Sequence, residues 1–321
     1  MTFLFRSLLA AALLIFATGS GAQPYPAKAI RFVVGFPAGS SIDVVSRIVL
    51  DDLRARTGAT IVIENRPGAL GAIGMEVVSR AEPDGYTLMP SSSATHSSGP
   101  HLSRAVQKLD PVSGLTHVAR TARFDVAVVT SAAGPYQNAR ALIEAARARP
   151  EALTYGFGSG TGQVGSAAFS TAAGIQARPV PYKGQPAAVI DLIGGQIDFV
   201  SSDLGAVLAL LKQGKLAAVA VLAERRSPML PAVPTAQEAG LPAITLGGWI
   251  GIDGPAKLPP EVSAWWADKL RATMAAPDVQ EKLRAIGMEP ALLTGENFAR
   301  FVQTEHERWG AHVRTAGIQP E

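Results

Sequence analysis

The sequence contains no cysteine, which excludes disulfide bonds, a thiol nucleophile and a lipid-anchoring cysteine. Charged residues are also scarce, at 17% of the chain, and aromatic residues make up only 6%. The lysines and arginines form no block and do not alternate with aromatic residues, and the formal net charge is only +3. A nucleic-acid partner, which requires a concentrated basic surface, is therefore not expected.

Long hydrophobic runs are missing as well, except at the N-terminus. Arg6 precedes an apolar run at 8–17, and the small residues 20–22 follow it. The run is shorter than the roughly 20 residues that span a bilayer. Its order of positive charge, apolar run and small residues is typical of a secretory signal peptide. We predict that residues 1–22 direct export and are cleaved off near Ala22.

The chain is rich in hydrophobic residues, which make up 47% of it and are enough for a sizeable core. From Ile30 onward, apolar runs typical of buried strands alternate with stretches of helical spacing. Residues 30–36 predict a strand, and residues 41–58 predict a helix with Ser41 as its N-cap and Gly58 at its end. This βαβ pattern favours an α/β fold with a doubly wound, parallel sheet.

The same alternation continues after Arg120, with no low-complexity linker between the two halves. We expect two doubly wound lobes joined by crossings near 120–124 and 223–227. The predicted order is a first lobe at 23–122, a second lobe at 123–225 and a return to the first lobe at 226–321, which includes two amphipathic C-terminal helices. A monomer is the default expectation.

One stretch, GSGTGQVG at 158–165, contains the G-x-G-x-x-G pattern of dinucleotide-binding loops between a strand and a helix. Such loops require an acid about 20 residues further on, at the tip of the next strand, to bind the ribose. That tip reads Pro181-Tyr182-Lys183, and the first acid, Asp191, lies inside a predicted helix. Neither a nucleotide nor any other cofactor is therefore expected.

Two other interpretations of this loop stay open. Its glycines permit a tight turn whose value is purely structural. Alternatively, they leave backbone N–H groups exposed at a helix N-terminus, where a carboxylate can bind as well as a phosphate. The residues of this candidate anion site are Gly158, Ser159, Gly160, Thr161 and Gly162.

The first half contains an equivalent loop, FPAGSSID at 36–43. Gly39 offers an exposed N–H group, and Ser40 and Ser41 add hydroxyl groups. Asp43 lies in the first turn of the helix, where capping is a more expected role than ligand contact. Ligands of doubly wound sheets lie outside the carboxyl ends of the strands, so the two loops would face each other around a small acid.

Other polar residues follow other predicted strands. Ser91, Ser92, Ser93 and Thr95 come after the strand YTLM and either line the same cleft or form an exposed loop.

Two side chains of the second half each have two interpretations. Tyr182 either contacts the ligand with its ring and hydroxyl or packs between the lobes. Asp203, which follows Ser201 and Ser202 at the end of a strand, either accepts a hydrogen bond from an amine of the ligand or caps a helix.

Catalytic and metal-binding patterns are missing. No serine lies in a G-x-S-x-G motif, and none of the five histidines belongs to an H-E-x-x-H motif. No catalytic residue and no metal site is therefore predicted.

Several blocks occur in order along the chain, among them AIRFVVGFPAGSSIDVVSR, VIENRPGALGAIG, AEPDGYTLM, PYKGQPAAVIDLIGGQIDF and RWGAHVRTAGIQPE. In these blocks the chain resembles the Bug (TctC-type) solute receptors of tripartite tricarboxylate transport systems. The resemblance implies a type II periplasmic binding-protein fold, in which two lobes close over a small organic acid in the periplasm and deliver it to a membrane permease. It implies no enzyme activity. It also implies that the ligand carboxylate is held by Phe36, Ala38, Gly39, Ser40, Asp43 and the loop 158–162.

The chain departs from the family pattern at three places. The usual F-P-P-G-G reads FPAGS here, so Ser40 replaces a glycine. The second loop lacks the histidine that usually follows it. The acid of the family's F-D-N falls on Ser202, and the acid of this chain is displaced to Asp203. If that acid binds the amine of amino-acid ligands, this chain prefers a ligand without an amine.

Two alternative functions stay open at this point. An exported α/β enzyme acting on a small acid or ester would need an activated nucleophile with a base within reach. A receptor that signals to a membrane sensor would need the same closing lobes as a transport receptor.

Overall fold

The structure of the protein is a computed structural model that describes residues 25–320. The predicted signal peptide lies outside the described residues.

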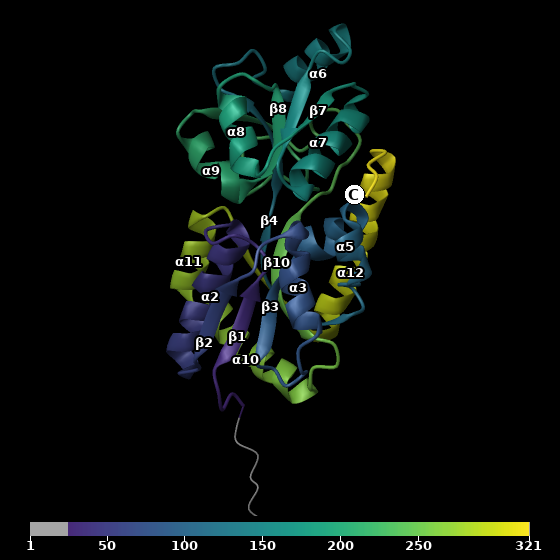
Figure 1. The fold of residues 1–321 in the computed structure, drawn as a ribbon. Coiled ribbons are helices and arrows are strands. Elements are labelled where there is room, and N and C mark those ends of the chain that lie inside the picture. The colour runs from purple at the N-terminus through teal and green to yellow at the C-terminus, as the bar shows by residue number, and fades with distance from the viewer. Residues whose placement is uncertain (1–24, 321) are drawn as a thin grey trace, which may run out of the picture.

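The first lobe is built on a sheet of six strands in the order β11-β4-β10-β3-β1-β2. The strands are β1 (Ile30–Val34), β2 (Ile61–Asn65), β3 (Thr87–Ser92), β4 (Leu115–Phe124), β10 (Gly248–Pro255) and β11 (Glu289–Thr294). The prediction of a parallel sheet holds for β2, β1 and β3, whereas β10 is antiparallel to β3 and β4, and β11 is antiparallel to β4. The difference arises because β4 leaves the first lobe and β10 returns to it, so that these two neighbours run in opposite directions (Figure 1).

The second lobe has a sheet of five strands in the order β7-β6-β8-β5-β9. They are β5 (Val126–Ser131), β6 (Thr154–Phe157), β7 (Arg178–Pro181), β8 (Phe199–Asp203) and β9 (Leu216–Val221). Strands β7, β6 and β8 are parallel, and β5 is antiparallel to both β8 and β9. Both lobes therefore have mixed sheets with a parallel part, and they lie one above the other with β4 and β10 between them (Figure 1).

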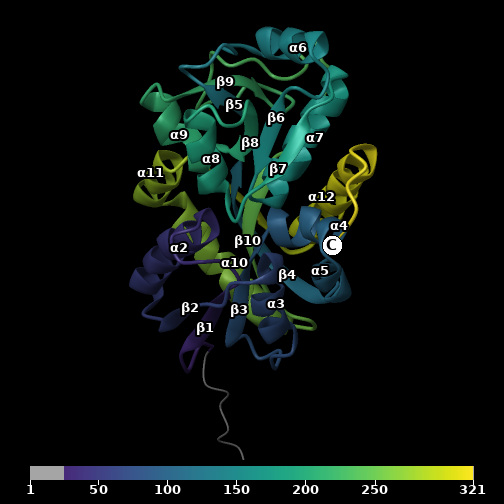
Figure 2. The same ribbon diagram turned by 45° about the horizontal axis from the view of Figure 1, so that its top comes forward.

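Helices cover both faces of each sheet (Figures 1 and 2). Those of the first lobe are α2 (Ser41–Thr57), η2 (Ala69–Gly71), α3 (Ala72–Ser79), the π-helix η3 (Ser93–Ser98), α4 (Gly99–Leu102), α5 (Arg104–Lys108), α10 (Pro260–Ala275), α11 (Pro277–Ala285) and α12 (Gly295–Thr315). Those of the second lobe are α6 (Ala139–Ala148), α7 (Gly160–Ala173), α8 (Gln185–Ile193) and α9 (Leu204–Lys212).

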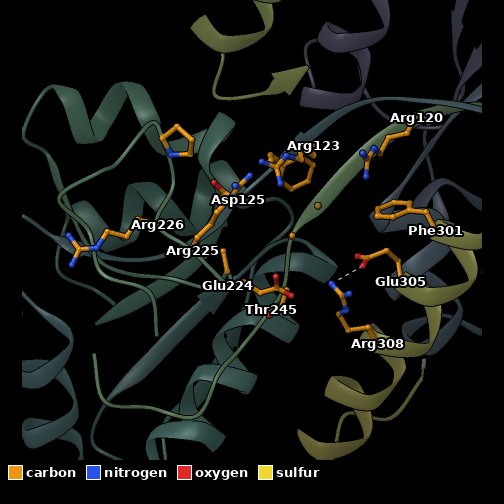
Figure 3. Close-up of a pocket in the computed structure, with 15 residues that line it drawn as sticks. Arg120, Arg123, Asp125, Glu224, Arg225, Arg226, Thr245, Phe301, Glu305 and Arg308 are labelled. Atoms are coloured by element: carbon orange, nitrogen blue, oxygen red, sulfur yellow. Dashed lines mark ion pairs between the residues drawn. The ribbon is translucent and has the colours of Figure 1, made fainter. Parts of the chain in front are cut away.

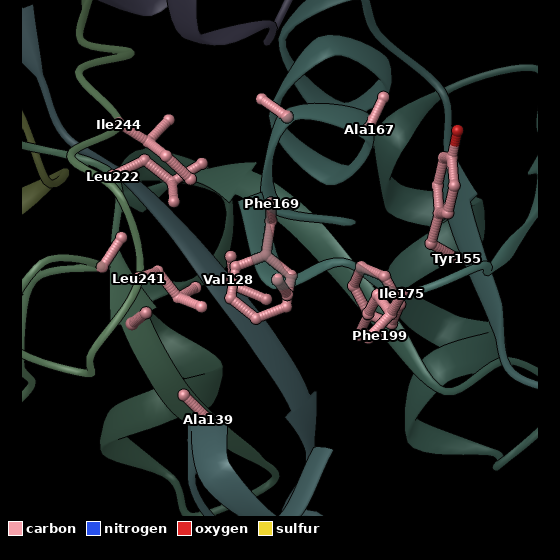
Figure 4. Packing of buried hydrophobic residues seen from close by; sticks show 14 of the residues in the cluster. Val128, Ala139, Tyr155, Ala167, Phe169, Ile175, Phe199, Leu222, Leu241 and Ile244 are labelled. Atoms are coloured by element: carbon pink, nitrogen blue, oxygen red, sulfur yellow. The ribbon is translucent and has the colours of Figure 1, made fainter. Parts of the chain in front are cut away.

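Each lobe has its own hydrophobic core. In the second lobe, Phe169 lies beside Val128 and Phe199 beside Ile175, as Figure 4 shows. Leu241 and other apolar residues between β9 and β10 pack in the same core. The segment between β9 and β10 therefore contributes to the core of the second lobe. The predicted boundaries themselves remain predictions.

The last helix, α12, connects the two lobes. Its early residue Phe298 packs with Trp249 of the first lobe, whereas its later residues Trp309 and Val313 belong to the core cluster of the second lobe. In Figure 2 the yellow α12 accordingly rises along the first lobe towards α7.

Candidate functional site

Four strands, two from each lobe, end at one cleft between the lobes. After β1, β3, β6 and β8 the chain enters α2, η3, α7 and α9, and the residues that cap these helices are Ser40, Ser92, Ser159 and Asp203. All four caps line a single cavity of about 160 Å³. Because helix N-termini carry exposed N–H groups and a partial positive charge, the start of α2 and the start of α7 both favour an anion in this cleft.

The loop before α2 is held in shape by Asp43. The carboxylate of Asp43 accepts hydrogen bonds from the Gly39 N–H at 2.9 Å and from Asn65 Nδ2 at 2.9 Å. It also accepts bonds from Nε and Nη2 of Arg47, at 2.9 and 3.0 Å. Burial alone would raise the pKa of Asp43, but the bonds from Arg47, Gly39 and Asn65 outweigh it and hold the pKa below its ordinary value. Asp43 is therefore a charged brace behind the loop, and it is not among the cleft-lining residues.

Ser40 is the true N-cap of α2, one residue before the Ser41 that we predicted. Its Oγ accepts a bond from the Asp43 N–H at 3.4 Å. Ser40, Ser41 and Phe36 line the cleft, whereas Ala38 and Gly39 are not among its lining residues.

The loop before α7 is held by a neutral side chain, Gln185. Its Oε1 accepts bonds from the Gly158 N–H at 3.1 Å and the Ser159 hydroxyl at 3.3 Å, and its Nε2 donates to the Ser201 carbonyl at 3.0 Å. Ser159 Oγ in turn accepts from the Gly162 N–H at 3.1 Å. Ser159 therefore both caps α7 and belongs to the network around Gln185.

Only Ser159 and Thr161 of this loop line the cleft, and the three glycines pack behind them. An added Cβ would lie 2.0 Å from the Gly184 carbonyl carbon at Gly158 and 2.7 Å from Gln185 Oε1 at Gly162. At Gly160 it would lie 2.8 Å from Leu102 of the first lobe. The glycines are thus required for close packing, and the structural interpretation of the motif holds for them.

The serine-rich segment after β3 forms another wall of the cleft. Ser92 and Ser93 line it. Ser92 and Thr95 cap η3 reciprocally, because the Ser92 N–H donates to Thr95 Oγ1 at 3.1 Å and the Thr95 N–H donates to Ser92 Oγ at 3.3 Å. Ser91 and Thr95 are fully buried behind this wall, so the segment is not an exposed loop.

Asp203 lines the cleft and caps α9, so the structure shows the capping contact, one of the two predicted for it. Its Oδ1 accepts a bond from the Ala206 N–H at 2.9 Å, and burial raises the pKa of its carboxyl group. The neighbouring Ser202 is buried, and its hydroxyl donates to the Asp203 carbonyl at 3.3 Å. Ser202 is not among the lining residues.

Tyr182 is not brought to the cleft. Its hydroxyl donates to Asp191 Oδ2 at 2.8 Å, and its ring packs against a hydrophobic cluster of the second lobe. The structure thus shows neither of the two contacts predicted for Tyr182, because the loop turns its ring back onto its own lobe.

Besides Phe36, four apolar residues line the cleft that sequence reasoning missed: Ile42, Ala94, Phe124 and Ile250. Ile42 and Ala94 directly follow predicted site residues, so the helix starts could have indicated them. Phe124 and Ile250 lie on the two strands that cross between the lobes, β4 and β10, whose pairing is not visible in the sequence. Of the described residues that line the cleft, none is a lysine, an arginine or a histidine.

A second cavity, of about 190 Å³, lies at the crossing between the lobes and is lined by charged residues (Figure 3). Arg308 Nη1 and Glu305 Oε1 form an ion pair of 3.0 Å there. The Arg120 guanidinium lies over the Phe301 ring at 4.5 Å, and burial and the neighbouring Arg123 lower its pKa to about 10. The lining of this second cavity therefore contains both basic and acidic side chains. The lining of the cleft differs, because helix N-termini and hydroxyl groups from both lobes converge there.

The structure has two α/β lobes with a polar site between them. This arrangement is typical of two-lobed solute receptors. The chain matches the family model described as "Tripartite tricarboxylate transporter family receptor" over residues 45–318, and it belongs to this family. The family consists of solute-binding receptors, so the alternative of an enzyme is set aside. Within 25–320, no helix combines the length and the apolar character needed to cross a membrane.

The chain is similar to several individual proteins. It is 30% identical to protein BugT of Bordetella pertussis over 305 residues, which cover 93% of this chain and 92% of that protein. A solved R. palustris protein with adipate is 30% identical and has a TM-score of 0.85, with 92% of this chain and all of that chain covered. The structure of MatC from Rhodopseudomonas palustris with bound malate is 26% identical and has a TM-score of 0.79, with coverages of 90% and 100%.

Proposed function

We propose that the protein is exported to the periplasm, captures a small organic carboxylate between its lobes and delivers it to a membrane permease of the tripartite tricarboxylate type. The observation that carries this proposal is the convergence of Ser40, Ser92, Ser159 and Asp203, the caps of four helices from both lobes, in one cavity.

The chemistry of the cleft suits a carboxylate without any basic side chain. The start of α2 and the start of α7 supply partial positive charge, and the hydroxyls of Ser41 and Thr161 can donate to carboxylate oxygens. Backbone and hydroxyl donors fixed by Asp43 and Gln185 need little reordering when the ligand binds, which favours affinity.

The apolar side of the cleft narrows the ligand class. Phe36, Ile42, Phe124 and Ile250 offer surface to a hydrocarbon body rather than to further polar groups. We propose a carboxylate with an alkyl or aromatic body and no amine, since the acid of this chain is displaced by one position from the family's acid and its Oδ1 already accepts a bond from the Ala206 N–H. The relative solved with adipate, an alkyl dicarboxylate, supports this class.

A binding screen of the mature chain, residues 23–321, tests the proposal. The protein is unfolded and refolded once to remove any carried ligand and is then heated with adipate, malate, benzoate or aspartate. At 100 times its dissociation constant, a ligand of the folded form should add about 2.7 kcal/mol to the free energy of unfolding. We expect stabilisation by a carboxylate without an amine, and a loss of at least tenfold in its affinity in Thr161→Val.

Tyr182→Phe is the matched control, because Tyr182 lies outside the cleft and its ring stays in place. Its ligand affinity should equal that of the unchanged protein. Binding of aspartate with micromolar affinity would contradict the proposal that the ligand carries no amine. Failure of all carboxylates, or binding that is insensitive to Thr161→Val, would contradict the cleft as the carboxylate site.

Delivery to a permease requires a separate test in cells. We expect the mature chain in the periplasmic fraction and loss of uptake of the identified acid when its gene is deleted. Binding in the screen together with unchanged uptake in the deletion strain would contradict the transport role and leave the receptor intact.

A further inference from the structure

Three side chains that are far apart in the sequence form a buried cluster beneath the wall of the cleft. Asp253 lies on β10, His117 on the neighbouring β4, and His96 in η3. Asp253 Oδ2 lies 2.7 Å from His117 Nδ1 and 2.9 Å from His96 Nε2. The side chains of Asp253 and His96 are fully buried, and that of His117 is 5% exposed. The cluster is separate from the ligand cleft, because none of the three residues lines it.

Hydrogen bonds among the described residues do not account for all polar atoms of this cluster. Asp253 Oδ1 and His96 Nε2 are buried and have no hydrogen-bond partner, although His96 Nε2 is close to Asp253 Oδ2. The nearby Ser91 Oγ on β3 is also buried without a partner. Buried polar atoms without partners are costly and indicate a missing water or ion.

The outer nitrogens of both imidazole rings do have partners. His117 Nε2 lies 2.9 Å from the Val112 carbonyl oxygen, and His96 Nδ1 lies 2.8 Å from Thr95 Oγ1. Histidine ligands of metal ions almost always use their other nitrogen in this way, which fixes the tautomer and aims the free nitrogen at the ion. Here His117 Nδ1 and His96 Nε2 are the nitrogens that face Asp253.

We propose that His96, His117 and Asp253 form a binding site for a divalent transition-metal ion of the zinc type. Two imidazoles and one carboxylate are a donor set of zinc sites, with bonds of about 2.0–2.2 Å. The three ligand atoms all lie within 4.8 Å of one another, and two nitrogens bound to one such ion are at most about 4 Å apart. When all three atoms bind one ion, the two nitrogens approach each other, and the nitrogen–oxygen distances of 2.7 and 2.9 Å widen to about 3.3 Å, which small side-chain rotations can provide.

Ion binding replaces the proton that His117 shares with Asp253. His117 Nδ1 donates to Asp253 Oδ2 while His117 Nε2 donates to the Val112 carbonyl, so the ring carries both protons without the ion. The ion takes the place of the proton on Nδ1, and that proton leaves to solvent. The charge of the cluster rises from zero to +1, which a bound hydroxide or a deprotonated group as fourth ligand can reduce.

The site joins three elements that support the cleft. β4 and β10 are the two crossings between the lobes, and η3 is capped by Ser92, which lines the cleft. An ion held by all three would fix η3 against the crossing strands. We expect the effect on stability to exceed the effect on ligand affinity, because none of the three ligands lines the cleft.

The experiment uses the mature chain refolded with Co²⁺, whose visible absorption reports tetrahedral nitrogen and oxygen ligands. Refolding is needed because the cluster is buried and offers no direct entry. After dialysis we expect one ion per chain by elemental analysis, displacement of Co²⁺ by Zn²⁺, and a higher melting temperature than that of the chelator-treated protein. Ion content at trace level after refolding, with no absorption band, would overturn the proposal.

Matched variants locate the ion. His117→Gln and Asp253→Asn should each weaken Co²⁺ binding by about 100-fold or more, since each removes a direct ligand. The control is His101→Gln, because His101 stacks on His306 at 4.3 Å and could bind ions adventitiously. A bound ion that survives in both cluster variants and is lost in His101→Gln would contradict the proposed location.

A variant that fails to fold would not show whether the cluster binds the ion. A second measurement is therefore made on the unchanged protein. Competition with a chelator gives the affinity for Zn²⁺ directly, and X-ray absorption of the Zn²⁺-loaded protein gives its ligands. A spectrum that shows two imidazole ligands and one carboxylate ligand would support the proposed site. A shell of oxygen ligands alone would overturn it.

Discussion

The two loops that face each other across the cleft have the same backbone design but different supporting side chains. In each, a serine caps a helix and accepts a bond from the N–H three residues later, Ser40 from Asp43 and Ser159 from Gly162. The first loop is held by the charged pair of Asp43 and Arg47. The second is held by the neutral amide of Gln185.

This difference shows that the anion site depends on the position of N–H and hydroxyl groups rather than on one supporting residue. Because the pair of Asp43 and Arg47 holds the first loop, the stability of this loop depends on pH. The second loop depends on close packing of glycines against Gly184 and Gln185, which is sensitive to volume. Substitutions that separate these two kinds of support test the comparison.

The largest effect is expected from added volume. In Gly158→Ala the new Cβ would lie 2.0 Å from the backbone of Gly184, so the loop must move. We expect a loss of about 3 kcal/mol or more in the free energy of unfolding. Gly39→Ala, in the first loop, meets nothing within 4 Å and carries only the strain of φ +81°, about 1–2 kcal/mol. Urea denaturation of both variants checks this, and equal losses would refute the contrast.

The next effect concerns the charged brace. Asp43→Asn should cost about 2 kcal/mol at pH 7, because it weakens the bonds to Arg47, Gly39 and Asn65. The folded pKa of Asp43 lies below the unfolded value of about 3.9. Its contribution is therefore full above that value and is lost as the pH falls through the folded pKa.

Gln185→Met provides the neutral counterpart. It removes bonds to Gly158, Ser159 and Ser201, and its cost should not change between pH 7 and pH 3. Denaturation at several pH values measures both variants. A cost of Asp43→Asn that stays constant down to pH 2 would contradict the charged brace.

A smaller and equal effect is expected from the two caps. Ser40→Ala and Ser159→Ala should each cost about 1 kcal/mol of stability, since each leaves one helix N–H without its partner. Both should also weaken carboxylate binding, measured by calorimetry. A change of affinity in only one of them would show that the ligand uses a single loop.

The smallest effect is expected at Asp203. Burial raises the pKa of Asp203, so its carboxyl is neutralised at a higher pH than usual and repels a carboxylate ligand less as the pH falls. Asp203→Asn, which keeps a side chain able to cap α9, should raise carboxylate affinity by about threefold at pH 7. The ligand affinities of the two proteins should converge as the pH falls, and weaker binding by the variant would contradict this role.

The sequence predicted the alternation of strands and helices and the two loops because these are local patterns. Small residues between an apolar run and a helical stretch mark a loop whatever the rest of the chain does. The antiparallel β10 and β4 could not be predicted in this way, since their pairing joins residues more than a hundred positions apart.

The direction in which side chains point could not be predicted from the sequence either. Asp43 and Tyr182 were both candidates for the cleft, and bonds to Arg47 and Asp191 turn them elsewhere. The cluster of His96, His117 and Asp253 was missed because no local spacing connects these positions. It becomes visible only when β4, β10 and η3 lie together.

The helix α12 has a practical consequence for following the protein in solution. Trp309 is fully buried where α12 of the first lobe meets the core of the second. The other three tryptophans pack within the first lobe. Separation of the lobes would expose Trp309 to water and change its fluorescence, while the others keep their surroundings. Trp309 fluorescence would therefore report any separation of the lobes, and no attached dye is needed.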